Sequence, residues 1–102
     1  MFINGEWRKT EDKLKIYNPA TGEEVFEMDH GTKEDVQDAI DAADEAFKTW
    51  SKTSALERAN ILLEIYQRME DRKEELAQVI TKEMGKPIND ARGEAQSAID
   101  YF

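Results

Sequence analysis

The chain has 102 residues, the size of one ordinary domain, and its 14 basic and 23 acidic side chains give a net charge of −9. It has no cysteine and one histidine, which excludes a disulfide framework, a thiolate metal site and a cysteine nucleophile within these residues. No apolar run approaches the ~20 residues of a membrane span, and the first residues do not resemble a signal peptide. The acidity argues against nucleic acid as a partner, because phosphate binding needs clustered Lys and Arg. These features fit a cytoplasmic protein.

Residues 1–31 carry the strand and turn signals of the sequence. An Asn-Gly pair at residues 4–5 separates two short runs, and both residues tolerate the positive φ of a type I′ hairpin turn. Residues 13–17 alternate between polar and apolar side chains, which predicts a strand. The Asn-Pro-Ala-Thr-Gly run at 18–22 predicts a turn, and a further strand is expected at 24–28.

Residues 32–102 have the apolar spacing of about four α-helices. Three pairs have the spacing of a helix N-cap: Thr32 with Asp35, Ser54 with Glu57 and, less clearly, Asp71 with Glu74. Gly85 suits the left-handed end of a helix, and Pro87 suits the first turn of the next one. The expected fold is therefore a short N-terminal β region, residues 1–31, followed by a helical part, residues 32–102.

The apolar stripes of these helices predict both burial and exposure. On the first helix we expect a buried stripe of Val36, Ala39, Ile40, Ala43, Ala46, Phe47 and Trp50. The stripe of the last helix continues to Phe102 without a stop signal, which predicts a helix cut in mid-pattern, as in a truncated chain. Since only short strands are available to cover four helices, we also expect exposed apolar patches and self-association.

Few side chains suggest chemistry by their spacing. His30 has no evident partner and is interpreted as a loop residue in preference to a ligand or base. The many carboxylates sit at helical spacings typical of solvated faces. Gly85-Lys86-Pro87 lacks the upstream glycine and the following Ser or Thr of a phosphate-binding loop. By themselves, the patterns indicate only an acidic, mainly helical protein with a small β element.

Blocks of residues along the whole chain nevertheless resemble the opening of the aldehyde dehydrogenase superfamily, in the same order and at similar spacing. They include Ile3-Asn4-Gly5-Glu6-Trp7, Asn18-Pro19-Ala20-Thr21-Gly22, Glu83-Met84-Gly85-Lys86-Pro87 and Ala91-Arg92-Gly93-Glu94. The resemblance runs from Ile3 to Phe102 and lies closest to the succinate-semialdehyde branch. It implies that the full-length parent has an α/β fold. This chain would be the N-terminal segment of the parent's cofactor domain.

The resemblance implies NAD(P)-dependent oxidation of an aldehyde to an acid, through a cysteine nucleophile and a glutamate-activated water. None of those family residues has a counterpart here, so the catalytic domain is absent. We expect no catalytic or cofactor-binding residue, an inactive segment, and NAD or NADP bound only by the full-length parent. The partners implied are the remainder of the chain and, in the parent, further copies of it.

Some members of the family also bind a monovalent cation. The resemblance matches its ligands to the backbone carbonyls of Ile16 and Tyr17 and to the carboxylate of Glu94. Oxygen-only ligation suits a hard cation. The alternative is that Glu94 is an ordinary glutamate on a helix surface.

Two other functions fit the composition. One is a free-standing acidic helical interaction module without enzymatic activity, which would be monomeric and cooperatively folded. The other is an acidic metal-binding protein or nucleic-acid mimic, and it is weakened by the basic residues interspersed along the chain.

Overall fold

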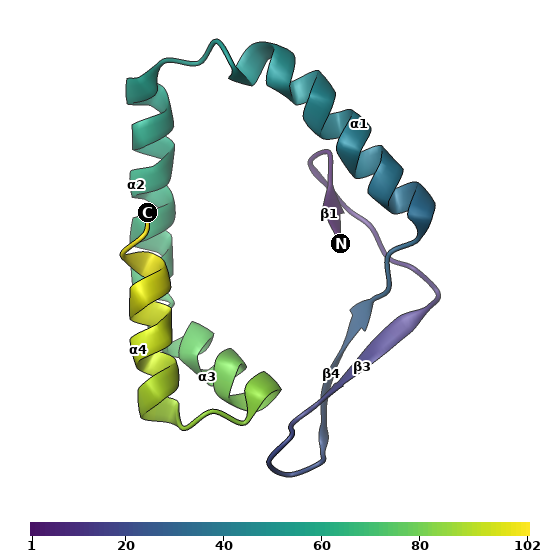
Figure 1. Ribbon diagram of the computed structural model, residues 1–102, viewed down its shortest axis with the longest axis vertical. Helices are drawn as coiled ribbons and strands as arrows, with labels where there is room; N and C mark the ends of the chain where they lie inside the picture. Colours follow the sequence, from purple (N-terminus) through teal and green to yellow (C-terminus); the bar gives the residue numbers. More distant parts are fainter. The chain divides into compact units, whose positions relative to one another are not determined.

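The computed structural model describes all residues 1–102 and follows the predicted order of short strands and four helices (Figure 1). The elements are β1 (Phe2–Ile3), β2 (Glu6–Trp7), β3 (Lys13–Tyr17), β4 (Glu24–Asp29), α1 (Lys33–Trp50), α2 (Ala55–Asp71), α3 (Lys73–Met84) and α4 (Ile88–Ile99). They form two compact units: a first unit of Met1–Lys15 and Glu27–Ser54, and a second unit of Ile16–Phe26 and Ala55–Phe102. None of the helices combines the length and the apolar character that a membrane crossing requires.

The first hairpin confirms the turn predicted at the Asn-Gly pair. β1 and β2 are antiparallel, with Phe2 opposite Trp7 and Ile3 opposite Glu6. Asn4 and Gly5 have φ angles of 52° and 80°, as a type I′ turn requires. Ile3 is the one buried apolar residue of the first unit, at 8% exposure.

β3 and β4 form a second two-stranded sheet, and β4 extends one residue beyond its predicted end. The connection is closed by the Gly22 N–H, which donates to the Asn18 carbonyl oxygen at 2.7 Å. The Asn18 side-chain oxygen also accepts from the Ala20 N–H at 2.9 Å. Gly22 has a φ of 75°, so the turn needs a residue that tolerates the left-handed region.

α1 starts at the predicted capping box. The Thr32 hydroxyl accepts from the Asp35 N–H at 3.1 Å, and the Asp35 carboxylate accepts from the Thr32 N–H at 3.0 Å. These two bonds satisfy backbone donors that the first helical turn leaves unpaired.

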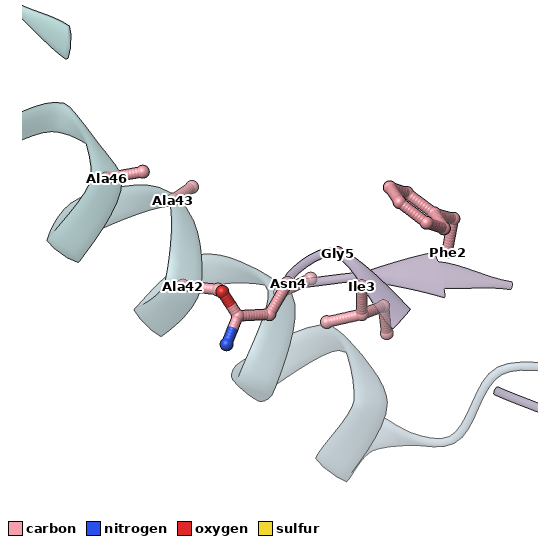
Figure 2. Close-up of a pocket in the computed structure, with 8 residues that line it drawn as sticks. Phe2, Ile3, Asn4, Gly5, Ala42, Ala43 and Ala46 are labelled. Atoms are coloured by element: carbon pink, nitrogen blue, oxygen red, sulfur yellow. The ribbon is translucent and has the colours of Figure 1, made fainter. Parts of the chain in front are cut away.

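The predicted burial of the α1 stripe is wrong. No residue of α1 is buried, and Val36, Ile40 and Phe47 are 57%, 57% and 63% exposed. The β1–β2 hairpin packs on α1, and the pocket they share is lined by the small alanines of the helix (Figure 2). The large apolar side chains of α1 remain exposed. The prediction of exposed apolar patches is confirmed.

The second unit has a core of small residues. α4 packs on α3 and also contacts α2. Ala77, Ala91 and Ala95 are buried where these helices meet, and Ile99 is completely buried. Leu76, Ile80 and Ile88 cover the alanine cluster. Methyl side chains occupy little space, which lets the helices approach closely.

The helix ends differ from the predictions at two places. Arg72 precedes α3 and makes no side-chain cap bond, while Asp71 is the last residue of α2, so Asp71 is not an N-cap. The last helix does not run to Phe102: α4 ends at Ile99, and the Phe102 N–H donates to the Ile99 carbonyl at 3.1 Å. That bond links residues three positions apart, whereas the hydrogen bonds of an α-helix link residues four positions apart.

Gly85 confirms its predicted role at the end of α3. Its φ is 69°, and its N–H donates to the Thr81 carbonyl oxygen at 2.9 Å. Pro87 directly precedes Ile88, the first residue of α4. A Cβ added to Gly85 would lie 3.0 Å from Pro19 Cγ and 3.4 Å from Ala20 Cβ, so the β3–β4 turn packs tightly on this glycine.

Candidate functional site

The first unit contains an apolar pocket of about 380 Å³ between the β1–β2 hairpin and α1 (Figure 2). Its lining consists of Phe2, Ile3, Asn4, Gly5, Ala39, Ala42, Ala43 and Ala46. Asn4 supplies the only polar side chain of this lining. A pocket of methyl groups with one amide offers apolar contact but contains no nucleophile, acid or base.

Arg8 links the segment after β2 to the first turns of α1. Its guanidinium donates to Asp38 Oδ2 at 2.6 Å and lies 3.7 Å from Asp35 Oδ1. The hydrogen bond to Asp38 raises the pKa of Arg8. The pKa of Asp35 is lowered, chiefly by the Thr32 backbone N–H and then by the Thr32 hydroxyl.

Asp29, at the end of β4, is the most strongly perturbed carboxylate. It forms an ion pair with Lys13, accepts from the Thr10 N–H at 2.8 Å and lies 3.7 Å from the Met1 ammonium group. The Lys13 bond, and then the Thr10 bond, lower the pKa of Asp29 to about 2. These contacts connect the end of β4 to Thr10, Lys13 and the N-terminus.

His30 has a partner that the sequence did not reveal. Its Nδ1 lies 2.8 Å from Asp12 Oδ2, and its backbone N–H donates to the Asp12 carbonyl at 3.1 Å. The two side chains are exposed. No group of three or more His, Cys, Asp or Glu residues is placed to hold a metal ion.

The three predicted cation ligands lie in the second unit. Ile16 and Tyr17 end β3, where Ile16 is half-buried and Tyr17 exposed, and Glu94 lies on α4. The Glu94 carboxylate forms an ion pair with Lys86. Lys86 binds Glu94 Oε2, so its ammonium group competes with a cation for this carboxylate.

An ion pair between α3 and α4 was also not predicted from the sequence. The Arg92 guanidinium binds both carboxylate oxygens of Glu74, each at 2.8 Å, and lowers the pKa of Glu74. Helical spacing rules find pairs three or four residues apart, whereas these residues are 18 apart. Only the packing of the two helices brings them together.

The chain therefore combines an apolar pocket beside α1 with ion pairs that hold its elements together. Its family is shown by comparison: residues 7–102 match the sequence model of the aldehyde dehydrogenase family. The chain belongs to the aldehyde dehydrogenase family, which confirms the resemblance drawn from its motifs.

The chain is 45% identical over 101 residues to a malonate-semialdehyde dehydrogenase of Bacillus pumilus and 46% identical to malonate-semialdehyde dehydrogenase 2 of Bacillus cereus. Each alignment covers 97% of this chain and 21% of the relative. The chain thus spans about one fifth of the length of these relatives. Their names differ from the succinate-semialdehyde branch suggested by the motifs.

Solved structures show the same fold. An NADP-dependent glyceraldehyde-3-phosphate dehydrogenase from Bacillus halodurans, complexed with NADP, has a TM-score of 0.93 at 33% identity, covering 97% of this chain and 21% of that one. A point mutant of betaine aldehyde dehydrogenase from Staphylococcus aureus, in complex with NAD+, has a TM-score of 0.89 at 31% identity, covering 93% and 20%. The expected fold of short strands followed by four helices is confirmed.

Proposed function

We propose that this chain is the N-terminal segment of an NAD(P)-dependent aldehyde dehydrogenase that oxidises an aldehyde to a carboxylic acid. The family match over residues 7–102, with about one fifth of each relative covered, is the observation that carries the proposal. The β-rich residues 1–31 and the helical residues 32–102 then both belong to the cofactor domain, and the catalytic domain lies outside this chain.

The segment itself is non-catalytic. It contains no cysteine to attack an aldehyde carbonyl, and its one histidine bonds an exposed aspartate. The residues present do not fit NAD or NADP: Gly5 and Gly22 serve separate turns, Gly85 ends α3, and the pocket beside α1 is lined by alanines and the first hairpin. The parent binds the cofactor with residues outside this chain.

The role of the segment is to supply packing surfaces to the rest of the enzyme. α1 exposes Val36, Ile40 and Phe47, and α2 exposes Leu56, Leu62 and Leu63. Each helix thus exposes several large apolar side chains, and exposed apolar patches mark interfaces. The remainder of the polypeptide covers these faces, which explains why an apolar stripe with helical spacing is exposed in the segment alone.

The parent enzyme is cytoplasmic and homo-oligomeric in this proposal, and it oxidises a semialdehyde. The identity of 45% to a malonate-semialdehyde dehydrogenase supports that substrate class. The alternative function, a free-standing interaction module, predicts that the same 102 residues form a complete and stable monomer.

A chimera tests the scaffold role. The chain replaces the matching residues of the Bacillus pumilus enzyme, and reduction of NAD(P)+ by malonate semialdehyde is followed. We expect the chimera to turn over substrate and the 102 residues alone to be inactive. Turnover by the segment alone, or a folded chimera without turnover, would contradict the scaffold role.

Phe47→Asp distinguishes a docking face from a solvent face. Phe47 is 63% exposed, so the substitution is expected to change the stability of the segment little. In the chimera it buries a charge, and we expect loss of folding and activity. Asp41→Ala, whose wild-type carboxylate only accepts from Gln37, is the control expected to leave both proteins intact. Equal effects of Phe47→Asp in the two proteins would refute docking by α1.

We also propose that the carbonyls of Ile16 and Tyr17, with the carboxylate of Glu94, hold a monovalent cation in the parent. The supporting observation is that the three residues share one compact unit. In the chimera, Glu94→Gln is expected to abolish stabilisation by potassium, and Lys86→Gln to strengthen it by freeing the carboxylate. Unchanged potassium dependence in Glu94→Gln would reject this site.

A further inference from the structure

We draw no further inference here: the strongest candidate, the exposed apolar stripe of α1 together with the alanine-lined pocket beside it, is an unpartnered helix face, and nothing in the structure shows what covers it beyond the docking already proposed.

Discussion

The first unit buries a single apolar side chain, that of Ile3, whereas the second buries Ala77, Ala91, Ala95 and Ile99. In the first unit, polar contacts take the place of an apolar core. Arg8 binds Asp38. Asp29 forms ion pairs with Lys13 and the Met1 ammonium group and accepts a hydrogen bond from the Thr10 N–H. The second unit adds ion pairs to an apolar core that is already present.

This difference predicts different sensitivities. Burial of apolar surface is insensitive to pH, while exposed ion pairs weaken when salt screens them or when a carboxylate is protonated. We therefore expect the first unit to open first in acid, and the second to respond most to changes of side-chain volume. Hydrogen exchange measures the protection of individual amides and therefore follows the opening of each unit separately.

The largest effect is expected from Ile99→Ala. Ile99 is completely buried, and truncation of a buried Ile to Ala leaves a cavity that costs ~2–5 kcal/mol. Amide protection should fall throughout α3 and α4 and stay unchanged in α1. Ile40→Ala is the matched control, because Ile40 is 57% exposed. Equal losses in the two variants would contradict the division into a core and an uncovered stripe.

Gly85→Ala is expected to destabilise the second unit by about 1–2 kcal/mol, since an L-residue is disfavoured at φ 69°. The new Cβ would also press on Pro19 Cγ at 3.0 Å. Gly93→Ala is the control of opposite sign: Gly93 lies within α4, and no atom other than the neighbouring backbone of its own helix lies within 4 Å of the added Cβ. There we expect a gain of about 0.5–1 kcal/mol in the free energy of unfolding.

Thr32→Ala tests the first unit. Removal of an N-cap hydroxyl costs ~1 kcal/mol, because the Asp35 N–H loses its acceptor. Exchange should accelerate in the first turn of α1 while α3 and α4 remain protected. Thr32→Ser keeps the hydroxyl and should preserve the protection; if it loses as much as Thr32→Ala, the cap is not the cause.

The smallest effect is the pH dependence of the first unit. The pKa of Asp29 is about 2 in the folded chain against an ordinary 3.8, so its contribution is complete above about pH 4 and is lost as the pH falls toward 2. Amides near Thr10 should lose protection in that window. Asp29→Asn should flatten this response, and Asp41→Asn should retain it. A wild-type response outside the window would show that another group controls opening.

Local elements were predictable from single residues and short patterns. The Asn4-Gly5 turn, the Thr32 cap and the Gly85 helix end were all confirmed, because each depends on backbone preferences and bonds within a few residues. The end of the last helix was predicted wrongly, because an apolar stripe indicates which face of a helix is apolar but not the residue at which the helix ends. The candidate cation ligands Ile16, Tyr17 and Glu94 remain a prediction from the family resemblance.

The sequence by itself determined the order of strands and helices and the family. Turn residues, helical spacing and ordered motifs each depend on residues that are close together in the sequence. Tertiary structure decided which apolar residues are buried: Ala91 is covered, while Phe47, on an equally regular stripe, is not. It also paired Arg8 with Asp38 and Glu74 with Arg92. Hydrophobic attraction has no direction, so burial depends on the surface that lies opposite, and periodicity alone does not supply that surface.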